Sequence, residues 1–162
     1  MPADRNPGRI RGMRGLTYVE LLVAMTVLAV LAAVALPMAR WDQKRRDEAR
    51  LRTTLTIMRA AIDKYKEFSD KGMIVPSDVE QLGYPRTLEE LVEGVDVGDP
   101  ENAEKLRFLA RIPVDPMTGL AEWGLRSYQD DWDSDTWGRE NVYDVYSLSD
   151  RRALDGSYYR DW

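Results

Sequence analysis

The strongest constraint on this chain is an almost unbroken apolar run, LLVAMTVLAVLAAVAL, that begins directly after Glu20. From Leu16 to Ala39 there are 24 residues, enough for a tilted helix to cross a hydrocarbon core about 30 Å thick. A charged side chain at the centre of such a helix costs roughly 2.5 to 3.5 kcal/mol. The sequence therefore predicts a transmembrane helix over residues 16–39, and Glu20 at its edge needs a partner or a role.

The segment before this run is basic, as in a targeting peptide. Its charged residues are Arg5, Arg9, Arg11 and Arg14, with Asp4. No small-residue cleavage site lies at the polar end of the apolar run, so we expect the run to stay attached as an anchor. Charge alone does not fix its orientation, because residues 40–52 carry six basic side chains, more than the leader does.

An amphipathic helix is predicted to follow the anchor, over residues 40–71. One apolar face is formed by Leu51, Leu55, Met58, Ile62, Tyr65 and Phe68, at spacings of three and four residues. Gly72 is a suitable C-terminal stop. Pro37 removes one helical hydrogen bond, so we expect a kinked continuation there, although Pro37 could instead end the membrane helix.

Residues 72–162 are predicted to form a C-terminal globular part of short elements. A short helix is expected over residues 87–92, with Thr87 and Glu90 as a capping box. Further elements are expected as a second short helix over 100–109, a rigid RIPVDPMTG loop, and strands over 125–128 and 142–148. So small a sheet needs the amphipathic helix to bury its core, which predicts an α+β fold.

Composition excludes several classes of function. The chain has no Cys and no His, so it lacks a disulfide framework, thiolate metal ligands and the commonest general base. Residues 1–71 carry 14 Lys and Arg against 8 Asp and Glu, whereas residues 72–162 carry 9 against 20. An acidic C-terminal part repels nucleic acid. The sequence therefore predicts neither an enzyme nor a nucleic-acid-binding protein.

The N-terminal motif Arg14-Gly15-Leu16-Thr17-Tyr18-Val19-Glu20, followed by the apolar helix, resembles type IV pilin-like proteins. The resemblance implies that residues 1–15 are a leader, which a prepilin peptidase removes between Gly15 and Leu16 before methylating the new amine. It also implies a single-pass protein of the bacterial inner membrane with its C-terminal part in the periplasm. Leu16 stands where the family usually has Phe.

The resemblance gives Glu20 a role. Cleavage would create a cationic amine at Leu16, and Glu20 lies four residues further along the same helical face. In a filament, the family likeness implies that Glu20 compensates the Leu16 amine of a neighbouring subunit, where a wrong register leaves both charges unpaired. The alternative is an interfacial glutamate without a partner.

The C-terminal half narrows the resemblance. The RIPVDPMTG loop, Trp123-Gly124 and the closing YDVYSLSDRRALDGSYYRDW are similar to major pseudopilins of type II secretion systems. This implies a homopolymer that forms a periplasmic filament for protein export, with an inner-membrane assembly platform and minor pseudopilins as partners. Alternatives are a type IV pilin of a surface fibre and a membrane-tethered module that binds calcium or a basic ligand.

The same likeness implies calcium near the C-terminus, with the Leu148 carbonyl and the Asp150 and Asp155 carboxylates as ligands. Oxygen-rich loops suit calcium, but Arg151 and Arg152 add two opposing positive charges, and the alternative is a hydrogen-bonded turn at Asp155-Gly156. A second acidic cluster lacks the bidentate Glu of a calcium loop and is interpreted as a surface turn, with Trp132 and Trp137 tucked inward. Its acidic residues are Asp130, Asp131, Asp133 and Asp135.

Overall fold

A computed structural model describes residues 17–74, 78–97, 105–131, 133–134 and 136–162, except for the side chains of residues 34–39. The chain divides into two compact units, one ending at Trp41 and the other spanning Asp42–Trp162. Each unit is described by itself. The predicted cleavage site at Gly15 and Leu16 lies outside the described residues.

The first unit contains the beginning of α1, a helix that spans Tyr18–Asp70. Its apolar side chains are exposed up to residue 33. Within the described part of the chain, no helix has both the length and the apolar character needed to cross a membrane. The predicted span over 16–39 includes residues beyond that part, so it stays a prediction, as does the kink at Pro37.

In the second unit, α1 presents the predicted apolar face to the core. Leu51, Leu55, Met58, Ile62 and Tyr65 are all buried, and Phe68 packs against them. The helix ends in a Schellman turn, in which Gly72 adopts a φ of 70°. The Gly72 N–H donates to the Ser69 backbone carbonyl, and the Met73 N–H donates to the Phe68 backbone carbonyl. The amphipathic face and its glycine stop are confirmed.

The remaining elements of this unit are short. They are η1 (Val79–Gln81), α2 (Leu88–Glu93), β1 (Val95–Asp96), β2 (Lys105–Leu106), β3 (Gly124–Arg126), β4 (Asp144–Tyr146) and η2 (Tyr159–Asp161). β1 pairs antiparallel with β2, and β3 pairs antiparallel with β4. The α+β class with small antiparallel sheets is confirmed.

Two local predictions were wrong in detail. A second short helix was predicted over residues 100–109, but residues 105–106 form strand β2. In this two-residue strand, Leu106 pairs with Val95 of β1. Thr87 is the N-cap of α2, as predicted, but its side chain makes no capping hydrogen bond. Glu90 accepts hydrogen bonds from the Arg86 N–H and the Tyr65 hydroxyl instead of completing a capping box.

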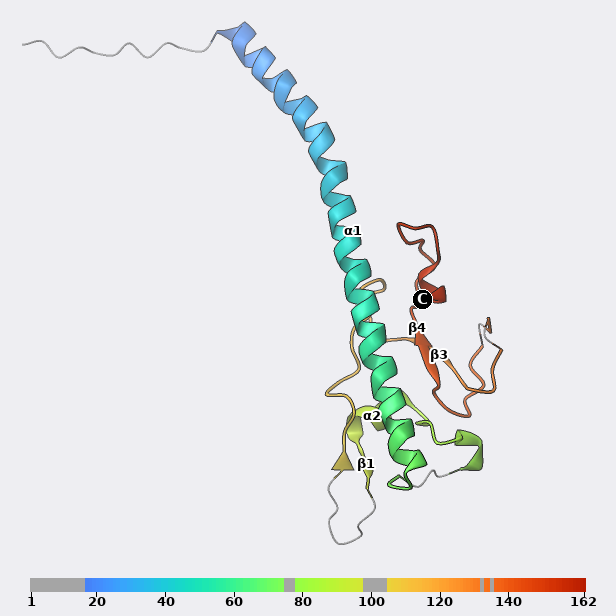
Figure 1. Ribbon diagram of the computed structural model, residues 1–162. Helices are drawn as coiled ribbons and strands as arrows, with labels where there is room; N and C mark the ends of the chain where they lie inside the picture. Colours follow the sequence, from blue (N-terminus) through green and yellow to red (C-terminus); the bar gives the residue numbers. More distant parts are fainter. Residues whose placement is uncertain (1–16, 75–77, 98–104, 132, 135) are drawn as a thin grey trace, which may run out of the picture. The chain divides into compact units, whose positions relative to one another are not determined.

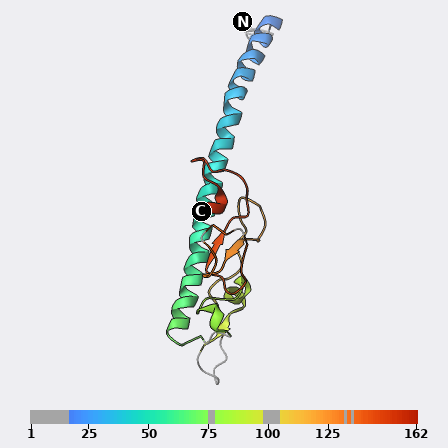
Figure 2. The same cartoon turned by 90° about the vertical axis from the view of Figure 1, so that its right-hand side faces the viewer.

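The sheets and loops lie along one side of this part of α1, as the two perpendicular views show (Figures 1 and 2). Gly124 pairs with Tyr146 in the β3–β4 ladder, and a Cβ at position 124 would come within 2.3 Å of the Tyr146 ring. The preceding Trp123 is buried and donates from its indole N–H to the Pro113 carbonyl at 2.9 Å. The Trp-Gly motif therefore joins the proline-rich loop to the sheet.

Candidate functional site

Glu20, the predicted assembly residue, lies exposed in the first turn of α1. Its backbone N–H donates to Thr17 Oγ1 at 3.3 Å, which is the hydrogen bond of an N-cap. A carboxylate in the first helical turn also interacts favourably with the helix dipole. Thr17 and Glu20 thus have capping-box spacing, a signal in the sequence that the prediction did not use. The predicted partner, Leu16, lies outside the described residues.

The C-terminal segment is held against α1 by polar contacts. Lys44 Nζ donates to the Arg152 carbonyl at 2.7 Å. Glu48 accepts two hydrogen bonds, from the Leu154 N–H at 2.8 Å and from the Tyr159 hydroxyl at 3.0 Å. These contacts close the loop with the protein's own side chains.

The residues of all three predicted calcium ligands are described in this loop. The Leu148 side chain and Asp150 are exposed, and Asp155 Oδ1 accepts hydrogen bonds from the Ser157 N–H and hydroxyl at 3.0 and 2.6 Å. These hydrogen bonds from Ser157, with a smaller effect of the Arg52 charge, lower the pKa of Asp155.

A positive charge lies next to one of the predicted calcium ligands. Arg52 Nη2 lies 3.8 Å from Asp155 Oδ2 in a solvent-exposed ion pair. In the part of the chain that the structure describes, no group of three or more Asp, Glu, His or Cys side chains is placed to hold a metal ion. Calcium binding itself is untested and stays a prediction.

The acidic cluster forms a turn where it is described. Asp130 Oδ2 accepts hydrogen bonds from the Ser127 and Gly138 N–H groups at 2.7 and 3.2 Å. Trp137 is half-buried and donates to the Asn141 carbonyl at 2.8 Å. Trp132 and Asp135 lie outside the described residues.

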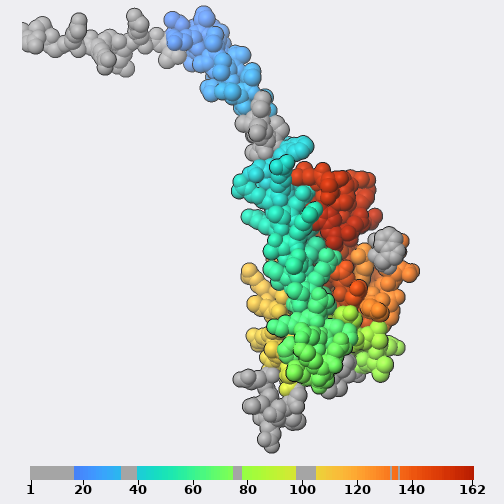
Figure 3. Space-filling model, in the orientation of Figure 1, coloured from blue at the N-terminus to red at the C-terminus, as the bar shows by residue number. Residues whose placement is uncertain are grey.

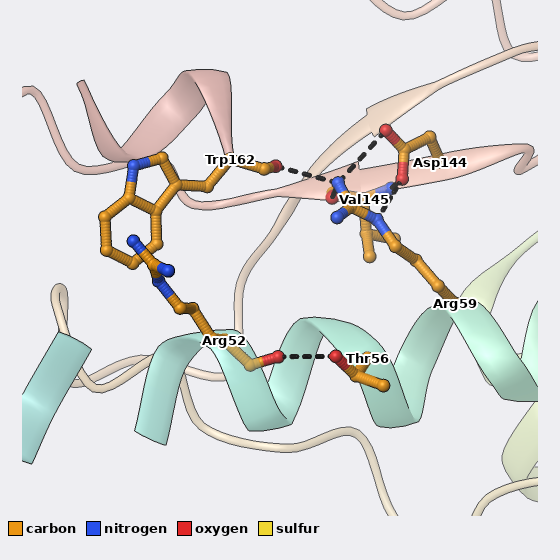
Figure 4. Close-up of polar contacts among 6 residues, drawn as sticks. All are labelled: Arg52, Thr56, Arg59, Asp144, Val145 and Trp162. Carbon is orange, nitrogen blue, oxygen red and sulfur yellow. Dashed lines mark hydrogen bonds and ion pairs between the residues drawn. The ribbon is translucent and has the colours of Figure 1, made fainter. Parts of the chain in front are cut away.

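Arg59 is the main polar link between α1 and the C-terminal sheet (Figure 4). Its Nε lies 2.6 Å from Asp144 Oδ1, and its Nη2 donates to the backbone carbonyls of Val145 and Trp162 at 3.2 and 2.7 Å. A planar guanidinium can serve several acceptors at fixed angles, which a lysine cannot. Arg59 therefore fixes β4 and the Trp162 backbone to the same turn of helix.

A pocket of about 360 Å³ lies beside this link. Its lining residues are Arg52, Leu55, Thr56, Arg59 and Trp162. Arg52 stacks on the Trp162 indole, with its guanidinium carbon 4.3 Å from the ring centroid (Figure 4). Two arginines, a leucine, a threonine and a tryptophan line this pocket. None of these side chains is a general base near neutral pH.

Asp115 is a second organising residue that sequence reasoning did not single out. It is fully buried in the RIPVDPMTG loop and accepts hydrogen bonds from the Met117 N–H and the Ser147 hydroxyl, both at 2.7 Å. Arg151 donates to the Met117 carbonyl. The proline-rich loop is thereby joined both to the chain after β4 and to the C-terminal loop, where Arg151 acts as a structural cation.

Two buried tyrosines donate hydrogen bonds to glutamates. Tyr65 on α1 donates to Glu90 on α2, and Tyr159 on η2 donates to Glu48 on α1. Burial raises the pKa of Tyr65 to about 12, with a further contribution from Glu90. Burial likewise raises the pKa of Tyr159 to about 12, and its hydrogen bond to Glu48 adds to the effect. Both hydroxyls are therefore neutral donors across the physiological range.

In the second unit, α1 packs along small antiparallel sheets and the C-terminal segment closes back onto this helix, as expected of a pilin-like protein. The chain belongs to the family of type II secretion system core protein G. It is 31% identical over 145 residues to that protein of Pseudomonas aeruginosa, covering 85% of this chain and 84% of the relative.

More distant relatives carry the same description. The core protein G of Vibrio cholerae is 24% identical, covering 86% of this chain and 82% of the relative. That of Escherichia coli K12 is 25% identical, covering 83% of this chain and 79% of the relative. No protein-family profile matches the chain, and no solved structure matches it significantly.

Proposed function

We propose that this protein is a structural subunit of the periplasmic pseudopilus of a type II secretion system. The observation that carries this proposal is the 31% identity to a type II secretion core protein G across most of both chains. The pilin-like α+β fold of the second unit supports it. The relatives' names favour secretion over the alternatives of a surface pilin or a tethered binding module.

The proposed life cycle has three steps. A prepilin peptidase cuts between Gly15 and Leu16 and methylates the new amine, while residues 16–39 hold the subunit in the inner membrane. An assembly platform then extracts the subunit into a homopolymer, with minor pseudopilins as further partners. During extraction Glu20 pairs with the Leu16 amine of a neighbour, because both charges are costly in an apolar bundle unless they are paired.

Processing and assembly can be tested separately with three full-length forms: wild type, Glu20→Val and Glu20→Asp. Mass spectrometry should show removal of residues 1–15 and a methylated N-terminus in all three. Filament yield should fall sharply for Glu20→Val and less for Glu20→Asp, which keeps the charge. Equal yields of filament from wild type and Glu20→Val would overturn the assigned role of Glu20.

The chemistry of the subunit is structural. The described contacts of its C-terminal segment are hydrogen bonds and ion pairs that fix the fold, as those of Arg59 and Glu48 illustrate. Calcium is left out of the proposed function, because the Asp155 carboxylate already accepts hydrogen bonds from Ser157 and faces Arg52.

A further inference from the structure

An exposed group of aromatic rings lies far from Glu20 in sequence. It consists of Tyr84, Tyr128 and Tyr143, called here the tyrosine patch. Each ring contacts the other two, with centroid distances of 5.2 to 6.0 Å. Tyr128 and Tyr143 are nevertheless 57% and 45% exposed. Clustered aromatic surface of this kind is typical of interaction sites.

The backbone under the patch is firmly held. The Tyr128 N–H donates to Asn141 Oδ1 at 2.9 Å, and the Tyr143 N–H donates to the Arg126 carbonyl at 2.8 Å. Asn141 is fully buried and also donates to the Glu80 carbonyl at 3.2 Å. The rings therefore stand on a prearranged surface, which reduces the entropy lost when a partner binds.

The chemistry of the patch favours a cationic partner. Tyrosine faces attract cations, and Lys66 Nζ already lies 5.5 Å from the centroid of the Tyr84 ring. Burial raises the pKa of Tyr84, followed by the neighbouring Tyr143 and Tyr128, with smaller contributions from the charges of Asp63 and Asp70. Residues 72–162 as a whole carry a strong excess of acidic side chains.

The same chain carries a complementary surface on α1. Residues 44–52 hold five basic side chains against Asp47 and Glu48. Arg45, Arg46 and Arg50 are exposed. Arg46 and Arg50 form ion pairs with Asp42 and Asp47 of the same helix, whereas the Arg45 side chain makes no hydrogen bond or ion pair with any residue that the structure describes. On the face drawn in Figure 3, the cyan part of this helix is uncovered beside the red C-terminal segment.

We propose that the tyrosine patch of one subunit docks the basic segment 44–52 of a second copy, an inference that rests on the proposed filament. The two surfaces cannot meet within one chain, because Arg45 and Lys66 are 21 residues apart on α1, or about 32 Å at 1.5 Å per residue. A contact between two different surfaces of identical subunits builds a ring when its rotation closes and an open helical filament when it does not, and the proposed filament requires the second case.

Cross-linking of the full-length protein tests this contact, since the chain has no native cysteine. Ala49→Cys lies one turn from Arg45, and Val79→Cys lies beside Glu80, whose carbonyl accepts from Gln129 next to Tyr128. Both positions are exposed. A chain with both cysteines, treated with a short bismaleimide in cells that assemble filaments, should give a ladder of dimers, trimers and longer products. Either cysteine alone should give none.

Charge variants identify the basis of the contact. Changing Arg45, Arg46 and Arg50 to Glu should lower the cross-linked fraction about tenfold, because attraction is replaced by repulsion across the contact. Tyr128→Ala together with Tyr143→Ala should also lower it. The matched control Arg111→Glu, another exposed arginine, should leave the ladder intact.

The outcomes separate this inference from the proposed function. Normal filaments without a ladder would overturn the docking contact and leave the pseudopilin function standing. A ladder that persists at full strength in both the Glu and the Ala variants would also overturn it. Absence of filaments from the wild-type protein, together with absence of a ladder, would reject both proposals.

Discussion

Arg59 on α1 and Asp144 on β4 form an ion pair across 85 residues of chain, with Nε 2.6 Å from Oδ1. The same guanidinium also bonds the carbonyls of Val145 and Trp162, so one side chain attaches both the sheet and the C-terminal segment to the helix. Its position on α1 is one residue after Met58, which is fully buried. The polar link therefore lies beside the apolar core and reinforces the same packing.

Removing this guanidinium should destabilise the subunit. Arg59→Ala leaves Asp144 and two carbonyls without their donor, and hydrogen bonds to charged groups contribute about 1.5 to 3 kcal/mol each when buried. Because Arg59 and Asp144 are partly exposed, we expect a total loss of about 1 to 2 kcal/mol. Denaturant unfolding of the full-length protein in detergent measures this loss. Arg111→Ala, a control on the surface, should change stability by less than about 0.5 kcal/mol.

Asp115 should be among the most sensitive polar positions. Asp115→Ala leaves the Met117 N–H and the Ser147 hydroxyl without their acceptor in a buried site, which costs about 2 to 4 kcal/mol in all. Ser147→Ala removes one partner and should cost less. Melting temperatures of the two variants, compared with wild type, give the order. A smaller loss for Asp115→Ala than for Ser147→Ala would contradict the central position assigned to Asp115.

Stability should fall in alkali between about pH 10 and pH 12. Tyr65 and Tyr159 have ordinary pKa values near 10 when unfolded and about 12 when folded. The folded protein then holds more protons in this interval, so its free energy of unfolding decreases as pH rises. The effect is absent below pH 10. Melting temperatures between pH 8 and pH 12 should decline less steeply in Tyr65→Phe plus Tyr159→Phe than in wild type, and parallel curves would reject the assignment.

Chelation should leave the C-terminal loop in place. Lys44, Glu48 and Arg151 hold the segment with direct hydrogen bonds, so its closure needs no cation from solution. We expect the melting temperature of the full-length protein to be the same in calcium and in EDTA. A ligand that binds only the folded state raises that temperature, so a rise in calcium that disappears in Asp150→Ala plus Asp155→Ala would establish the site that the family likeness implies.

The sequence predicted features that depend on local periodicity. The apolar face from Leu51 to Phe68, the stop at Gly72 and the positions of β3 and β4 follow from spacing and turn chemistry within a few residues. Strand β2 was missed because two residues have no recognisable period. Its pairing with Val95 depends on how the chain returns from the intervening segment.

The polar links could not be predicted, because they depend on which of many charged residues meet in space. Nothing in the neighbours of Arg59 distinguishes it from the exposed Arg50, yet Arg59 bonds groups 85 or more residues away. The contacts of Glu90 also depend on which groups meet in space. Its carboxylate accepts hydrogen bonds from the Tyr65 hydroxyl of α1 and from the Arg86 N–H, in place of the expected capping contact. Asp115 was visible only as part of a proline-rich loop.

The most direct test of the pseudopilin function is a gene deletion in the host that carries it, with the secreted proteins and the surface fibres compared before and after. Complementation with the wild-type gene should restore any loss. We predict that secreted proteins disappear from the medium and accumulate in the periplasm, while surface fibres remain normal. Unchanged secretion together with loss of surface fibres would contradict this function and identify the protein as a pilin.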